Sequence, residues 1–252
     1  MSTTGQDQIE APGTIPPASA QRPNRVRRLY REERQAWGRH YRRYFKYAAR
    51  ALGLGFVAGF LFFMLWPAQE KRALDFVVKS LKDIRMDEPP LGMAVTLFYH
   101  NARASVVAVA AGALPFLFLP IFDPILNGGV LGLLVSISRH QGLNVPLLIL
   151  TQILPHGVFE LAAVLYATSV GLYLSEGMGK KAVAAWKERK RSRLGEPAPA
   201  PVPEDFLGTY PERGESVTGS LSRNVVRSFV LVVLPLLLVA AFIEGFITPL
   251  LG

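Results

Sequence analysis

The feature that most constrains this chain is a set of long apolar blocks that contain almost no charge. Segment 104–122 has no charged residue, and segment 229–251 has only Glu244. A helix of about 20 apolar residues spans the roughly 30 Å hydrocarbon core of a bilayer. Only 19% of the chain is charged, whereas soluble domains average about 25%. These features exclude an ordinary soluble globular enzyme and indicate an integral membrane protein.

The fold class that we predict is all-α, a polytopic transmembrane helical bundle of about five spans with kinked or half-inserted helices. The predicted spans are 48–66, 104–122, 124–138, 156–174 and 225–251. Segment 124–138 is short for a span, and segment 145–154 is too short to cross alone. Region 124–154 therefore either spans the membrane or enters and returns on the same side, which would leave four spans.

Basic residues gather in two segments, and they predict the orientation of the bundle. Segment 22–50 carries eleven Lys and Arg against two acids, and segment 176–193 carries seven against two. Because positive charge is retained on the cytoplasmic side, we predict a multi-pass membrane protein with its N-terminus cytoplasmic and its C-terminus outside. The basic segments predict contact with membrane lipids. The sequence has no motif typical of proteins that bind a groove of DNA or RNA, so we expect no nucleic-acid partner.

These patterns divide the chain into five parts. They are a disordered tail (1–21), a basic amphipathic cytoplasmic helix (22–47), a membrane bundle of four spans with an outer loop at 67–100 (48–175), a cytoplasmic basic helix with a Pro-rich linker (176–224) and the last span (225–252).

Five polar residues lie in or beside the predicted spans, where an ionised side chain costs roughly 2.5–3.5 kcal/mol or more. They are Asn101, Arg103, His156, Glu160 and Glu244. In a five-span bundle all five fall toward the outer side, so we predict an intramembrane polar cluster in which Arg103 neutralises Glu160 or Glu244. The cluster either locks the helices together or forms a site for a solute, a proton or a lipid headgroup.

Small residues predict where helices approach closely. Asn127, Gly128 and Gly129 are unusual on a lipid-facing helix and indicate helix packing. Ala51, Gly55 and Gly59 recur every four residues in the first span, which is also typical of a close helix contact.

No catalytic residue, cofactor or metal site is predicted. The chain has no cysteine, no phosphate-binding loop and no nucleophile elbow. His156 and Glu160 share one helix face but supply only two metal ligands, whereas a catalytic zinc usually has three. His100 is a remote candidate for the third.

Four stretches of the sequence together resemble the stage II sporulation protein M family of membrane proteins. They are Asn101-Ala-Arg-Ala, Leu126-Asn127-Gly128-Gly129, Ile153-Leu-Pro155-His156-Gly157-Val-Phe-Glu160, and a closing stretch with Pro235, Glu244-Gly and Thr248-Pro249. The resemblance marks Asn101, Asn127, His156, Glu160 and Glu244 as family-characteristic.

The resemblance implies a non-enzymatic membrane scaffold that organises envelope partners, which in spore-formers serves cell-wall remodelling during engulfment. It also implies a place in the bacterial cytoplasmic (inner) membrane and membrane or envelope protein partners. The chain is a possible homo-oligomer. The alternative is a transporter or lipid-handling protein that uses the His, Glu and Arg cluster.

Overall fold

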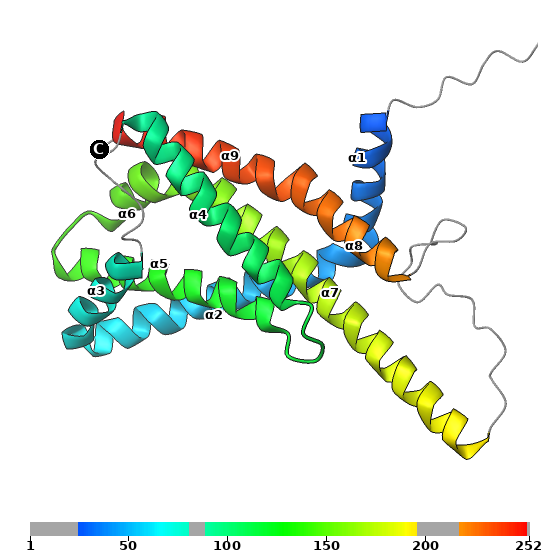
Figure 1. Ribbon diagram of the computed structural model, residues 1–252. Helices are drawn as coiled ribbons and strands as arrows, with labels where there is room; N and C mark the ends of the chain where they lie inside the picture. The colour runs from blue at the N-terminus through cyan, green and yellow to red at the C-terminus, as the bar shows by residue number, and fades with distance from the viewer. Residues whose placement is uncertain (1–24, 81–88, 196–216, 251–252) are drawn as a thin grey trace, which may run out of the picture.

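The computed structural model describes residues 25–80, 89–195 and 217–250, and within these ranges all regular structure is helical. The all-α bundle predicted from the sequence is confirmed. The predicted tail at 1–21 and most of the Pro-rich linker lie outside the described residues. Five long helical segments lie side by side (Figure 1). They are α2 (Arg42–Leu65), α4 (Pro90–Ala111), α5 (Phe122–His140), α7 (Leu154–Leu194) and a last segment made of α8 (Val217–Ser228), η5 (Phe229–Val233), α9 (Leu234–Phe242) and η6 (Ile243–Ile247).

Shorter helices connect or extend these segments. The first described helix, α1 (Arg25–Ala36), continues through the π-helix η1 (Trp37–Tyr41) into α2. The other short elements are η2 (Pro67–Gln69), α3 (Glu70–Ser80), η3 (Leu119–Ile121), α6 (Val145–Leu148), η4 (Ile149–Ile153) and η7 (Thr248–Leu250). Segment 145–154, predicted as half-inserted, is helical throughout and leads directly into α7.

Four helical stretches are long and apolar enough to cross a membrane. They are Arg25–Leu65, Leu119–His140, Leu154–Leu194 and Leu221–Leu250. Helix α4 is the fifth long helix and contacts both α7 and α9, but His100, Asn101 and Arg103 in its middle lower its hydropathy. In Figure 1 the five segments alternate in direction, so the end of the last segment lies at the opposite end of the bundle from α1.

The structure corrects the bounds of the second predicted span, 104–122. Helix α4 begins at Pro90 and ends at Ala111, so its first half falls in the predicted outer loop. The chain then turns through residues 112–118, where Phe116 and Phe118 have positive φ angles of 70° and 46°. Pro115 and Pro120 cannot donate backbone hydrogen bonds, which explains why the apolar run ends as a turn instead of continuing as a helix.

Helix α7 is the central element of the bundle. Nearly every residue from Ala163 to Tyr173 is buried, and α7 contacts α2, α4 and α9. A helix that is apolar on all sides is suited to this position.

Glycine allows α2 and α5 to pack almost backbone to backbone. A Cβ added to Gly132 would lie 2.5 Å from the amide nitrogen of Phe60, and one added to Gly59 would lie 2.7 Å from the carbonyl oxygen of Gly129. Real Cβ atoms essentially never come this close to another atom, so this pair of helices depends on its glycines.

Candidate functional site

Three of the five polar residues predicted to cluster come together at one end of the bundle. His156 and Glu160 lie one turn apart at the start of α7, and Glu244 lies in η6 near the end of the last segment. One ligand atom from each residue can be chosen so that all three lie within 4.8 Å of one another. All three residues are half-buried. The site is therefore neither sealed in the core nor open on the surface.

Local packing brings η6 to this position. Gly245 follows Glu244, and a Cβ added there would lie 2.8 Å from the carbonyl oxygen of Pro90 and 2.9 Å from the Cβ of Ala94. Glycine thus lets η6 lie directly against the start of α4. One turn later, the Thr248 hydroxyl lies 3.5 Å from Nδ1 of His156, so η7 also contacts the first turn of α7.

No Lys or Arg of the described residues neutralises the two carboxylates of this cluster. Two ionised carboxylates 4.8 Å apart repel each other by about 3.5 kcal/mol at an effective dielectric constant of about 20. Among the described residues, no Lys or Arg forms an ion pair with Glu160 or Glu244. Two such groups in close contact share a proton, pair with a protonated His156 or hold a cation.

The predicted pair of Arg103 with Glu160 or Glu244 is not formed. The buried residues of α4 include Ala94, Leu97, Ser105 and Ala108, which recur at helical spacing. Arg103 lies on the other face, is exposed, and has no ion pair within the described part of the chain. The pairing failed because α4 begins at Pro90, which places Arg103 in the body of a helix and turns its side chain outward.

The other predicted residues have separate roles in the structure. Asn101 is half-buried on α4 and is not among the three converging residues. The Asn127 side chain donates to the backbone oxygen and to Oδ1 of Asp123 within its own helix, at 2.9 and 3.1 Å. Gly128 faces α2 closely, whereas a Cβ on Gly129 would be 4.0 Å from its nearest neighbour, the carbonyl oxygen of Gly55.

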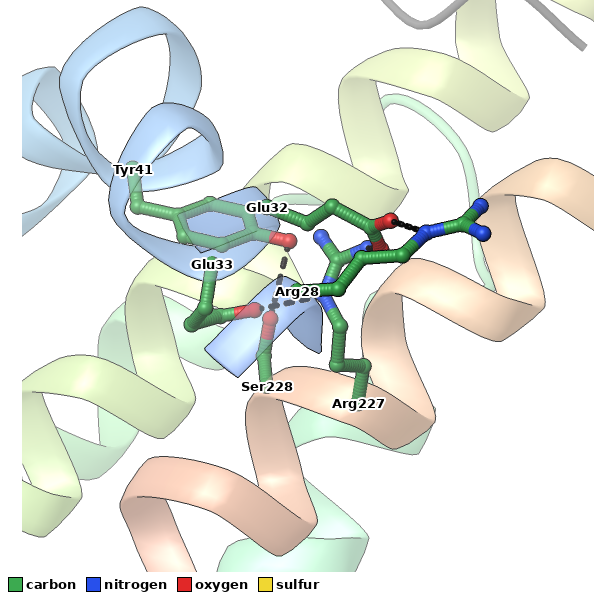
Figure 2. A network of polar contacts seen from close by, with 6 residues as sticks. All are labelled: Arg28, Glu32, Glu33, Tyr41, Arg227 and Ser228. Atoms are coloured by element: carbon green, nitrogen blue, oxygen red, sulfur yellow. Dashed lines mark hydrogen bonds and ion pairs between the residues drawn. The ribbon is translucent and has the colours of Figure 1, made fainter. Parts of the chain in front are cut away.

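A second polar site, centred on Glu33 of α1, was missed by the sequence analysis. Glu33 is only 4% exposed, and both of its carboxylate oxygens are used. The Tyr166 hydroxyl donates to Oε1 at 2.6 Å, and Nε of Arg227 donates to Oε2 at 2.9 Å. Figure 2 shows Glu33 and Arg227 pointing toward each other from α1 and α8.

Neighbouring contacts extend this network. Arg227 also reaches Glu32 at 3.1 Å, and Glu32 accepts from Arg28 at 2.9 Å. The hydroxyl of Ser228 donates to that of Tyr41 at 3.0 Å, and both residues are fully buried. Glu33 had been counted only as one of two acids in a basic segment. The pair of adjacent acids, Glu32 and Glu33, within so basic a segment was the available signal for a buried ion pair.

The two polar sites differ in chemistry. Arg227 and Glu244 are 17 residues apart on the last segment, or about 25 Å along a helix. In the Glu33 site the charges are paired and hydrogen-bonded, so the network joins α1, α7 and α8. In the His156, Glu160 and Glu244 site no Lys or Arg of the described residues pairs with the carboxylates, so this site is suited to a ligand.

Comparison with known proteins assigns the chain to a family. Residues 48–249 match the family described as stage II sporulation protein M. The chain belongs to that family. No curated protein and no solved structure matches the chain. The resemblance read from the sequence is thereby confirmed, and stage II sporulation protein M is not known as a family of enzymes.

The family match covers all of one site and only part of the other. His156, Glu160 and Glu244 all lie within it, and so do Tyr166 and Arg227. Helix α1 precedes it, so Glu33 connects a segment outside the stage II sporulation protein M region to the bundle.

Proposed function

We propose that this member of the stage II sporulation protein M family is a non-enzymatic membrane scaffold that organises envelope partners. In this proposal the basic end of the bundle lies in the cytoplasm of a bacterium, the protein spans the inner membrane, and the C-terminus is outside. The positive-inside rule supports this orientation, and family membership supports the type of protein.

The observation that carries the proposal is the projection of α7 beyond the bundle. Every residue from 182 to 194 is exposed, and this part of α7 is rich in Lys and Arg. Figure 1 shows it extending alone from the other helices. Trp186 is 62% exposed, and the Lys190 ammonium lies 5.7 Å from the centre of its ring. A basic helix with an exposed tryptophan is suited to an anionic leaflet.

At the other end, α3 offers a surface for an envelope partner. Glu70 at its start accepts from Ser136 at 2.7 Å and contacts the His140 ring at 2.9 Å, which fixes α3 to α5. Phe76 and Val78 are 71% and 56% exposed on the same helix. Exposed apolar side chains on a fixed helix are suited to contact with another protein.

Purification in mild detergent tests this proposal. We expect the full chain to retain a stoichiometric envelope protein together with anionic lipid. Phe76→Asp should lose the protein and keep the lipid, whereas Trp186→Asp, the matched control on the basic end, should do the reverse. Recovery of no stoichiometric protein, or recovery that neither variant changes, would refute the scaffold role.

A second candidate function is transport or lipid handling. It is favoured by the carboxylates of Glu160 and Glu244, which no Lys or Arg neutralises among the described residues, and by the π-helical segments η4 and η6 beside them. Such breaks often mark functional sites. Recovery of one tightly held lipid or solute, without a protein partner, would favour this function over the scaffold.

A further inference from the structure

We propose that His156, Glu160 and Glu244 bind one divalent transition-metal ion, with zinc as the probe. The proposal does not depend on the scaffold role. It rests on convergence, since a nitrogen or oxygen ligand atom from each of the three residues can lie within 4.8 Å of the other two. Two atoms that lie about 2.0–2.2 Å from one ion are at most about 4.4 Å apart, so small side-chain movements are enough to close the three ligand atoms around an ion.

The donor set selects the class of ion. One imidazole and two carboxylates provide one nitrogen and oxygen ligands, a combination that suits zinc, iron or manganese. Calcium and magnesium prefer oxygen ligands alone. Two carboxylates with a neutral imidazole carry a charge of −2, which a divalent ion neutralises within the membrane bundle.

The surroundings of Glu160 provide a second, independent observation. The residue is half-buried near the start of α7. Within the described residues it accepts no hydrogen bond and forms no ion pair. A carboxylate without a partner in a membrane bundle is costly, and an ion held between Glu160 and Glu244 removes that cost.

The contact of Thr248 is consistent with a metal site. Its hydroxyl oxygen lies 3.5 Å from Nδ1 of His156, which leaves Nε2 as the other ring nitrogen. Metal-binding histidines commonly have their second nitrogen held in this way, which fixes the orientation of the ring. Because all three residues are half-buried, an ion can reach them from one end of the bundle and keep water in its open positions.

The sequence alone places only two of these ligands, His156 and Glu160, on one helix face. The fold adds Glu244, which is 84 residues beyond Glu160 in the sequence. His100, the candidate considered for the third ligand, is not among the converging residues.

Zinc titration of the full-length protein tests the proposal. The protein is purified in detergent, stripped with a chelator and titrated by calorimetry. We expect one zinc ion per chain, and Glu244→Gln and Glu160→Gln should each weaken binding by more than 100-fold. This exceeds the roughly 10- to 100-fold effect of residues outside a ligand set. Zinc should also raise the unfolding midpoint of the wild type and leave that of the two variants unchanged.

Glu70→Gln is the matched control. Glu70 also contacts a histidine, His140, at 2.9 Å, but within the described part of the chain no third ligand group converges on this pair. The control should keep full zinc binding. Loss of binding in Glu70→Gln together with its retention in the other two variants would overturn the proposal.

A measurement on the wild type keeps the test decisive if the variants fail to fold. Cobalt replaces zinc, and its visible absorption becomes stronger in a site of low coordination number than in water. A stoichiometric increase in that absorption, reversed by excess zinc, supports the site. The absence of both zinc binding and this increase would overturn it and would leave a proton shared between the two carboxylates.

Discussion

Replacing Gly128 with alanine should separate the most closely packed pair of helices, α2 and α5. A Cβ at this position would lie 2.7 Å from the amide nitrogen of Phe56, and the carbonyl oxygen of Leu52 is closer still. Ordinary contact begins at 3.4 Å, so the two backbones must move apart by at least about 0.7 Å. Both atoms belong to a helical backbone and cannot rotate away as a side chain can.

The expected cost follows from overpacking. Added methyl groups in a well-packed interior typically cost about 1–3 kcal/mol, and separation of the backbones also weakens contacts along the rest of the interface. Alanine in a helix gains up to about 1 kcal/mol over glycine, which offsets part of this. We expect Gly128→Ala to lower the free energy of unfolding by about 1–3 kcal/mol.

The neighbouring glycine provides the control. A Cβ on Gly129 would be 4.0 Å from its nearest neighbour, so Gly129→Ala should be neutral or slightly stabilising. Both variants are compared with the wild type by titrating the folded protein from mild detergent into a denaturing detergent and following helicity by circular dichroism. Equal effects of the two substitutions, or no effect of Gly128→Ala, would refute the proposed backbone contact.

The remaining predictions concern the polar residues and use the same unfolding titration. Arg227→Met should cost about 3–5 kcal/mol, because it leaves the carboxylate of Glu33 buried without its cation; adding Glu33→Gln should recover part of that loss, and no recovery would contradict the pair. Tyr166→Phe should cost about 1.5–3 kcal/mol through loss of a hydrogen bond to a charged group, and a neutral result would exclude that bond. Arg103→Leu should change stability by no more than about 0.5 kcal/mol in the destabilising direction, since a larger loss would mean that Arg103 has a partner.

Apolar runs and charge bias were enough to predict an all-α membrane bundle. They located α2, α5, α7 and the last segment, because each contains a long stretch without charge. They misplaced α4, since His100, Asn101 and Arg103 interrupt its apolar residues and shifted the predicted start to 104. The spacing of Ala94, Leu97 and Ser105 on one face would have predicted that Arg103 points outward.

Contacts between remote parts of the chain were the hardest to predict. Glu33 and Arg227 are 194 residues apart in sequence, and no local pattern connects them. The convergence of Glu160 with Glu244 could be expected only because both are acids near the same end of predicted spans. The third member of that site, His156, follows from helical spacing, since it lies one turn from Glu160.

The bond between Glu33 and Arg227 has a consequence for how the protein is made. Glu33 is synthesised 194 residues before the guanidinium that neutralises it. Until Arg227 is made, α1 carries an acid that lacks its cationic partner. The ion pair that joins α1 to α8 can therefore form only after α2, α4, α5 and α7 have been synthesised, and a chain that stops before Arg227 would leave Glu33 without this partner.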